Sequence, residues 1–395
     1  MKVWEECVTD GDTMRILVDI GHPAHVHFFK NFIREMEKRG HTVLITARNK
    51  EITLDLLSKY NFNFLPVGVQ RSGKFNLIKE WIGRDFEIIR IAQKFKPHFL
   101  LGIGNPSIAH AAKLLRAKSV VFTDTEHAKF SNGITFPFAD VICTPSCYRS
   151  DIGPKQVRYN GYHELAYLHP NRFSPNPAVL AELGLKKGDP LFIVRFVSWQ
   201  ASHDVGRHGV RDKGGLVMAL EQYGRVLITS EGALPSELQP YQIRVSPEKL
   251  HDLLYYATLY VGEGATIASE CAIIGTHAIY INSLELGYIR EEDEKYQLVS
   301  NFSGKDCTDE MVLAEAKRLL QNPNLRKEGK EKGETLVRDK IDVTAFMVWF
   351  IEQFPESVDL MKSHPEIQQQ FRYQSHYMEE PCRTCYRRSE IEVQK

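Results

Sequence analysis

The sequence predicts an α/β protein of two domains, each built on a doubly wound parallel sheet. Short apolar runs that end at glycine alternate with segments of helical periodicity, as at residues 16–20 and 28–39, and this is the pattern of parallel strands joined by helical crossovers. The pattern begins again at residue 191, after a proline-studded stretch at 171–178. The 395 residues are enough for two cores of ordinary size. We therefore expect two Rossmann-like domains that face a common cleft.

The first domain is expected to span residues 14–170. Its strands are short apolar runs, and its helices carry apolar residues three and four positions apart. We expect strands at 16–20, 43–45, 99–103, 120–122 and 141–143, and helices at 28–39, 77–95 and 108–115. Residues 51–67 fit a further helix and strand. The nearly continuous apolar run at 99–103 is typical of a strand that is buried on both faces.

The second domain is expected at residues 179–340, after a linker at 171–178. We expect strands at 191–196, 225–229, 259–262 and 278–281, and helices at 247–257, 265–274 and 309–320, with a further helix at 343–354 after the domain. Residues 1–13 read as an extension ahead of Met14, since they lack the apolar core of a signal peptide. Residues 357–395 read as a polar tail, in which Cys382 and Cys385 alone are weak evidence for a metal.

Composition excludes several functions. Lysine plus arginine equals aspartate plus glutamate at 50 each, and no basic block is interleaved with aromatic residues, so we expect no nucleic-acid partner. No stretch approaches the roughly 20 apolar residues of a membrane helix. Seven scattered cysteines favour a reducing compartment. We expect a cytoplasmic protein with at most peripheral contact at the inner face of the membrane, and a homodimer stays open.

The most informative stretch runs from residue 259 to 282. It predicts a strand, a tight turn at Gly262 and Gly264, a helix and a second strand. The first amides of such a helix, around Gly264, Ala265 and Thr266, lack intrahelical acceptors and suit a phosphate or diphosphate. Glu270 lies one turn after Thr266 on the same face, where a carboxylate can accept two vicinal hydroxyls. The spacing fits a nucleoside diphosphate.

These residues also carry a resemblance. The segment Gly264-Ala-Thr-x-x-Ser-Glu270, followed by Gly275 and a strand, resembles the donor-binding segment of GT-B enzymes. It is similar to that of the N-acetylglucosaminyltransferase that completes lipid II and of the non-hydrolysing UDP-N-acetylglucosamine 2-epimerases. In those families the matching turn holds the donor diphosphate and the glutamate matching Glu270 holds the ribose. The resemblance also implies that the segment at 341–356 crosses back onto the first domain.

A second resemblance rests on three further motifs. Gly21-His-Pro-Ala-His-Val-His27, Gly161-Tyr-His-Glu164 and Ser202-His-Asp204 resemble an archaeal and bacterial family of unassigned function, DUF354, that is related to the same enzymes. The likeness covers roughly residues 14–350 and brings no established reaction with it.

Glu263 departs from the transferase pattern. Transferases usually place a small polar residue there, and a second carboxylate beside a diphosphate would repel it unless the side chain points away or is protonated. On the same side of the predicted cleft, Arg195 and Ser198 could bind the diphosphate. In the families named, the loop that follows Arg195 lies close to the donor, which makes Ser202 and His203 further candidates. Glu285 is a candidate acceptor for sugar hydroxyls.

Several loops of the first domain carry candidate catalytic and substrate-binding residues. His22, His25 and His27 follow the first strand, where imidazoles can bind a sugar or move a proton; their spacing matches no common metal pattern, and the alternative is capping or packing. Gly21 and Asn105 are expected at the same edge.

A second set of candidates is acidic. Asp124 and Glu126 lie in a loop dense in acids, and the resemblance to the epimerases implies that one of them takes part in the chemistry, the alternative being a structural loop. His163, beside Glu164 and near the linker, is a further candidate.

Three functions remain open. The first is a metal-independent GT-B glycosyltransferase that takes a UDP-sugar as donor and a lipid-linked or glycan acceptor, with His25 or Glu126 as the base. The second is a UDP-N-acetylglucosamine 2-epimerase, with Asp124, Glu126, His163 and His203 around the sugar. The third is a sugar-nucleotide-binding protein without catalysis, which Glu263 slightly favours. Each of them uses the nucleotide sugar itself and no further cofactor.

Overall fold

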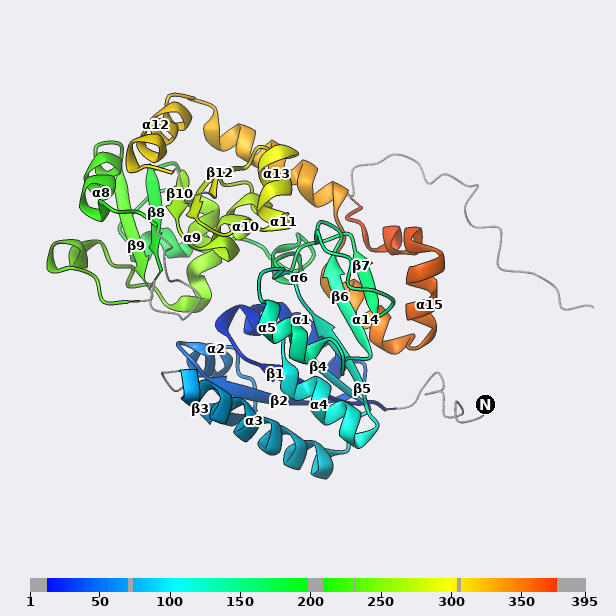
Figure 1. Ribbon diagram of the computed structural model, residues 1–395. Helices are drawn as coiled ribbons and strands as arrows, with labels where there is room; N and C mark the ends of the chain where they lie inside the picture. The colour runs from blue at the N-terminus through cyan, green and yellow to red at the C-terminus, as the bar shows by residue number, and fades with distance from the viewer. Residues whose placement is uncertain (1–12, 70–73, 198–208, 231, 304–306, 375–395) are drawn as a thin grey trace, which may run out of the picture.

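The computed structural model describes residues 13–69, 74–197, 209–230, 232–303 and 307–374, and for residue 69 and residues 74–81 only the course of the backbone. The predicted N-terminal extension, Cys382 and Cys385 lie outside the described residues. Two parallel sheets form two domains (Figure 1). The predicted fold class is therefore confirmed.

The described part of the first domain holds a sheet of seven strands in the order β3-β2-β1-β4-β5-β6-β7, all parallel. The strands are β1 (Arg15–Ile20), β2 (Thr42–Asn49), β3 (Phe64–Val69), β4 (Phe99–Ile103), β5 (Lys118–Phe122), β6 (Val141–Pro145) and β7 (Gln156–Tyr159). The order reverses between β1 and β4, and ligands of doubly wound sheets bind at such a point, beyond the carboxyl ends of the strands.

Helices cover both faces of this sheet. They are α1 (Pro23–Lys38), α2 (Thr53–Lys59), α3 (Lys74–Phe95), α4 (Pro106–Leu115), α5 (Lys129–Thr135) and the short α6 (Leu165–Leu168). Alternation along β1 explains the two layers, because Ile16 and Val18 pack in the core that contains α1, whereas Leu17 packs in the core that contains α4. Both faces of β1 are thus buried.

The second domain has five described strands in the order β12-β11-β10-β8-β9, also parallel. The strands are β8 (Leu191–Phe196), β9 (Arg225–Ser230), β10 (Leu259–Gly262), β11 (Ala278–Asn282) and β12 (Val299–Ser303). The helices are α7 (Ala178–Glu182), α8 (Lys213–Glu221), η1 (Ser236–Tyr241), η2 (Pro247–Lys249), α9 (Leu250–Tyr256), α10 (Ala265–Ile273), α11 (Gly287–Glu294), α12 (Asp309–Leu320) and α13 (Leu325–Asp339). Here the order reverses between β8 and β10.

The C-terminal helices return to the first domain. They are α14 (Val343–Glu352), α15 (Glu356–Ser363) and η3 (Pro365–Phe371), and α14 packs against α1 (Figure 1). The prediction of a polar tail from residue 357 is wrong for residues 357–374, because α15 buries Ser357 and Met361. Two buried positions on a short helix are too few to show a period in the sequence.

Two further helices were not expected. α13 is rich in charge, and its Gly329 and Gly333 lie against the turn at Gly275, where an added Cβ at Gly333 would come within 2.7 Å of the Gly275 Cα. The two glycines allow α13 to pack closely on the turn at Gly275. In the sequence, however, glycine has a low helix propensity and therefore argues against a helix. α11 begins at Gly287, inside the stretch expected to be a loop.

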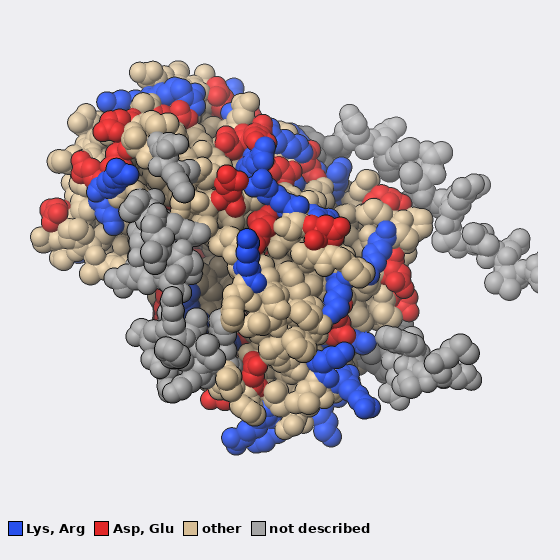
Figure 2. Space-filling view, in the orientation of Figure 1, with Lys and Arg blue, Asp and Glu red and all other residues tan. Residues whose placement is uncertain are grey.

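The distribution of charged side chains on the surface agrees with the balanced composition of the chain. Figure 2 shows lysine and arginine side chains interspersed with aspartate and glutamate over the face that it presents. Among the described residues, no helix combines the length and the apolar character that a bilayer crossing requires.

Candidate functional site

The predicted diphosphate site lies where the strand order of the second sheet reverses. Arg195, near the end of β8, pairs in register with Gly262, the last residue of β10. Helix α10 then starts at Ala265, and Gly264, Ala265 and Thr266 are each partly exposed. The first amides of α10 have no acceptors within the helix and lie at its positive end. Arg195 and these amides therefore form one site of positive potential.

Close packing holds Arg195 beside the turn. A Cβ added to Gly264 would lie 3.0 Å from the Arg195 Cδ, so only glycine leaves the side chain in place. Arg195 Nη1 donates to Thr229 Oγ1 over 3.1 Å. The Tyr260 hydroxyl accepts from the Gly264 amide over 3.3 Å and donates to the Gly264 carbonyl over 3.1 Å. The sequence did not indicate this role for Tyr260, because its position in an apolar run marks it only as a buried residue of a strand.

Glu263 points away from the start of α10. Its Oε2 accepts from the Val197 amide over 2.7 Å, its Oε1 accepts from the Val210 amide over 2.8 Å, and the residue is 1% exposed. The carboxylate thus ties together the two ends of the loop that follows β8. Because the carboxylate points away, the repulsion of a diphosphate that the sequence suggested does not arise in this geometry. Glu263 therefore no longer favours a binding protein without catalysis.

An imidazole and a carboxylate pair in the first domain. His163 Nδ1 lies 3.1 Å from Asp124 Oδ2, and the ring packs on Phe28 with centroids 4.6 Å apart. Burial alone would raise the pKa of Asp124, but the charge and hydrogen bond of His163, with a bond from Thr125, lower it to about 2. His163 Nε2 is buried and has no hydrogen-bond partner among the described residues. An Asp–His pair with one free ring nitrogen is the arrangement of a general base.

Two predicted histidines lie near this pair and near Arg195. His25 Nδ1 accepts from the Gly21 amide over 3.2 Å, which assigns the proton of the neutral ring to Nε2. Burial, with the charges of His22 and His163, lowers the pKa of His25 well below its usual range. His22 caps α1, and burial together with Lys50 and Arg195 lowers its pKa to about 3. The two domains face each other at this edge, where Lys59 Nζ of α2 donates to Ser246 Oγ of the second domain over 2.6 Å.

Glu126 reaches the second domain. Its Oε1 accepts from the Arg149 amide over 3.1 Å and would lie 3.0 Å from a Cβ at Gly287, the first residue of α11. Burial raises the pKa of Glu126, although the Arg149 amide opposes the shift. Its Oε2 has no partner among the described residues. A catalytic role for Glu126 stays a prediction.

Glu270 is not the open acceptor that the sequence predicts. Its Oε1 accepts from the Tyr167 hydroxyl over 2.7 Å and from His251 Nε2 over 3.0 Å, and the residue is 4% exposed. Because Tyr167 belongs to α6 of the first domain, this contact joins the domains. Oε2 is buried and has no partner among the described residues. Binding of ribose by Glu270 stays a prediction that requires the domains to part.

Three other predicted substrate-binding residues are engaged elsewhere. Asn105 caps α4 through the Ser107 amide and donates to the buried Asp19, so both ends of its amide are used. His27 packs against His251 with ring centroids 4.6 Å apart. Glu285 forms a surface ion pair of 2.9 Å with Arg149. Asn105 and His27 are buried and hold the first domain and the domain boundary together, whereas Glu285 is exposed and its role stays a prediction.

A cluster of buried carboxyl groups was missed. Ser269 Oγ donates to Glu292 Oε1 over 2.5 Å and lies 3.3 Å from Glu164 Oε2. Burial raises the pKa of Glu292 to about 8, and burial with the charges of Asp124 and Glu292 raises that of Glu164 well above its usual range. Burial therefore favours the protonated form of both carboxyl groups at the domain boundary.

Ser198, Ser202 and His203 lie outside the described residues. Within the described ranges, no group of three histidine, cysteine, aspartate or glutamate side chains could hold a metal ion.

Comparison with known proteins adds the family. The model of the family described as "Protein of unknown function (DUF354)" matches residues 14–348. The chain belongs to the DUF354 family. An uncharacterized protein of Methanocaldococcus jannaschii is 22% identical over 295 residues, which cover 70% of this chain and 86% of that protein.

Two solved structures place this DUF354 protein among GT-B folds. The UDP-N-acetylglucosamine 2-epimerase of Neisseria meningitidis, bound to UDP-N-acetylglucosamine, is similar with a TM-score of 0.63 at 12% identity, over 82% of this chain and 98% of that one. The spinosyn forosaminyltransferase SpnP is similar with a TM-score of 0.58 at 13% identity, over 88% of this chain and all of that one. At such identities the likeness shows the fold, which glycosyltransferases and epimerases share.

Proposed function

We propose that this DUF354 protein is a GT-B glycosyltransferase that takes a UDP-sugar as donor. One observation carries the proposal: the second domain places Arg195 beside the start of α10, the first domain holds an Asp–His pair with a free ring nitrogen, and the Tyr167–Glu270 contact joins the two domains. An anion site and a general base on opposite domains are what the transfer of a sugar from a diphosphate requires.

The residues have distinct roles in this proposal. His163 Nε2 removes the proton of an acceptor hydroxyl while Asp124 holds the ring. The acceptor oxygen attacks the anomeric carbon, the bond from that carbon to the diphosphate breaks, and its electron pair leaves with UDP. Amides at the start of α10, with Arg195, stabilise the charge on the leaving diphosphate, so no metal ion is assigned to this step. His25, with its proton on Nε2, donates a hydrogen bond to the bound sugar or acceptor.

Hydrogen bonding favours His163 over the two bases that the sequence suggested. His25 already uses Nδ1 as an acceptor, and Glu126 already accepts from the Arg149 amide through Oε1. A lipid-linked or glycan acceptor, a cytoplasmic location with at most peripheral membrane contact, and a homodimer are the settings that we propose for the reaction.

A 2-epimerase is the second candidate. Removal of the proton at carbon 2 and return of a proton to the other face require an acid and a base around one sugar. Glu126, with a raised pKa and one oxygen that lacks a partner among the described residues, could supply the acid, and His163 could supply the base.

The test is turnover of UDP-N-acetylglucosamine with and without acceptor glycans. Epimer formed without any acceptor would support the second candidate, release of UDP only with an acceptor would support the first, and binding without turnover would contradict both.

Variants of the Asp–His pair test its role in either reaction. In His163→Ala and Asp124→Asn we expect turnover to fall by roughly 10²- to 10⁴-fold, while the affinity for UDP stays within about twofold. His110→Ala is the matched control. His110 lies on α4, away from the domain boundary, and its Nδ1 pairs with Asp85 Oδ2 over 2.7 Å. Equal losses in His163→Ala and His110→Ala would contradict a catalytic role.

A further inference from the structure

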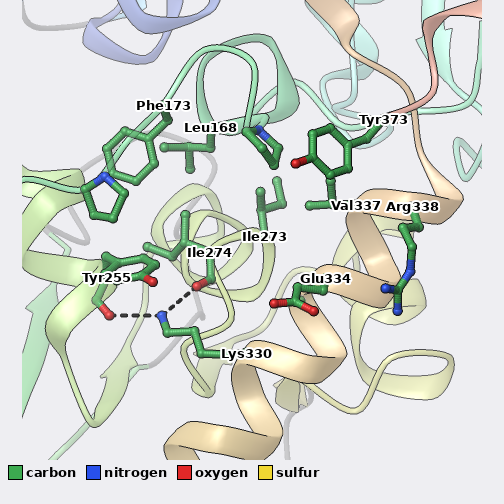
Figure 3. A pocket seen from close by; sticks show the side chains of 13 residues that line it. Leu168, Phe173, Tyr255, Ile273, Ile274, Lys330, Glu334, Val337, Arg338 and Tyr373 are labelled. Atoms are coloured by element: carbon green, nitrogen blue, oxygen red, sulfur yellow. Dashed lines mark hydrogen bonds between the residues drawn. The ribbon is translucent and has the colours of Figure 1, made fainter. Parts of the chain in front are cut away.

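A second cavity lies at the other end of α10. It has a volume of about 560 Å³, within the range of small-molecule sites, and it is lined by Ile273 and Ile274, whereas the proposed diphosphate site lies at Ala265 (Figure 3). Nine residues of helix span roughly 13 Å. One rigid helix therefore connects the two places.

The walls of this cavity come from both sides of the domain boundary. Leu168, from α6, Phe173, from the linker, and Tyr373, from the C-terminal segment, form one side in Figure 3. Ile274, directly after α10, and Val337, from α13, lie opposite. Because the second domain forms only one of the two walls, a molecule that fills the cavity would favour one relative placement of the domains.

The charged side chains that line the cavity all come from α13. Lys330, Glu334 and Arg338 recur every four residues and so share one helix face (Figure 3). The Lys330 ammonium lies 3.6 Å from the centre of the Tyr255 ring and donates to the carbonyls of Tyr255 and Ile274 over 3.0 and 2.7 Å. An ammonium has three donors, so one is left.

Arg338 is the group best placed to hold a ligand. Its Nη2 donates to Thr335 Oγ1 over 3.1 Å, and no carboxylate among the described residues pairs with it. Glu334 likewise has no ion-pair partner among the described residues. Because burial lowers the pKa of Lys330 to about 7, Arg338 carries the constant positive charge of the row. A guanidinium that keeps most of its donors matches a carboxylate or a phosphate through two parallel hydrogen bonds.

We propose that this cavity binds a small amphiphilic anion. Its apolar part lies between the linker and α10, and its carboxylate or phosphate is held by Arg338 at the mouth. The binding site stands independently of the proposed function. Coupling to nucleotide binding rests on the proposed function, because it requires UDP at the other end of α10.

Four probes with the same ten-carbon chain separate the contributions: decanoate, decyl phosphate, decanol and decyltrimethylammonium. Titration calorimetry on the full chain, below the micelle concentrations, should show both anions binding about tenfold or more tightly than decanol, and the cation most weakly. The ratio of decanoate to decyl phosphate then distinguishes the two headgroups. Equal affinity for anion and alcohol, or no saturable binding of any probe, would overturn the proposal.

Arg338→Gln is the test variant, and Arg318→Gln, on α12, is the matched control because Arg318 is exposed and does not line the cavity. We expect Arg338→Gln to lose the advantage of the anions over decanol and to leave the affinity for decanol unchanged, while Arg318→Gln behaves as wild type. Equal effects of the two variants would overturn the assignment of Arg338.

Coupling is measured as the change in UDP affinity when decanoate saturates the cavity. We expect a change of about fivefold or more in wild type and a smaller one in Arg338→Gln at the same decanoate concentration. Decanoate that binds without altering UDP affinity would overturn the coupling alone. Absence of UDP binding would instead count against the proposed function and leave the cavity site intact.

Discussion

Replacing Glu263 removes hydrogen bonds that hold Val197 and Val210 beside the end of β10. The carboxylate accepts two backbone N–H groups, from Val197 and Val210, and both bonds are short enough to be charge-assisted. Glu263→Gln keeps one acceptor and turns an NH₂ group toward the other amide, so one hydrogen bond to a charged acceptor is lost and one N–H is left without a partner.

A hydrogen bond to a charged group contributes about 1.5–3 kcal/mol, so the free energy of unfolding should fall by about 2–3 kcal/mol in Glu263→Gln and by about 3–6 kcal/mol in Glu263→Ala. Urea unfolding followed by circular dichroism measures this change, and the transition of the second domain is the one to compare if the domains unfold separately.

The same variants report on the direction in which the carboxylate points. Because it anchors the loop and points away from α10, Glu263→Gln should weaken UDP binding. A variant as stable as wild type would refute the anchoring role. A variant that binds UDP more tightly would show that the carboxylate faces the diphosphate.

Two further predictions concern buried carboxyl groups. The free energy of unfolding of Glu292→Gln should exceed that of wild type most above pH 8, by about 1.4 kcal/mol for each unit by which folding raises the pKa of Glu292. The protonated carboxyl group of wild type stabilises the fold fully below pH 4.5, and this stabilisation is lost as the pH rises through about 8. Urea unfolding at pH 5 and pH 9 checks this, and an equal difference at both values would contradict it. Glu270→Ala should lower the free energy of unfolding by about 1–3 kcal/mol, since Tyr167 and His251 lose their acceptor; a Tm unchanged in thermal unfolding would show that the domain contact has no energetic role.

Features that depend on local chain geometry could be read from the sequence. The strand, glycine turn and helix around Gly264 were predicted because apolar runs, glycine and helical spacing each reflect backbone preferences. The family resemblance was also carried by such local motifs, and the family match over residues 14–348 confirms it. α13 was missed because Gly329 and Gly333, which oppose a helix locally, are required by the contact with Gly275.

The partners of polar side chains could not be read in this way. Glu263 and Glu270 stand close together in the chain, yet one anchors a loop and the other joins the domains, because the second domain meets α6 only in the folded molecule. The same holds for Asn105, whose amide is used by Asp19 and the start of α4. Candidate residue types follow from the sequence, whereas the choice of His163 over His25 as the base required the hydrogen bonds.

Titration calorimetry of UDP and uridine against wild type and Arg195→Ala measures the anion site most directly. The account predicts that UDP binds wild type more tightly than uridine does, and that Arg195→Ala weakens UDP by about tenfold or more without changing the affinity for uridine. Equal affinity of wild type for UDP and uridine, or an unchanged affinity for UDP in Arg195→Ala, would contradict a diphosphate at the start of α10.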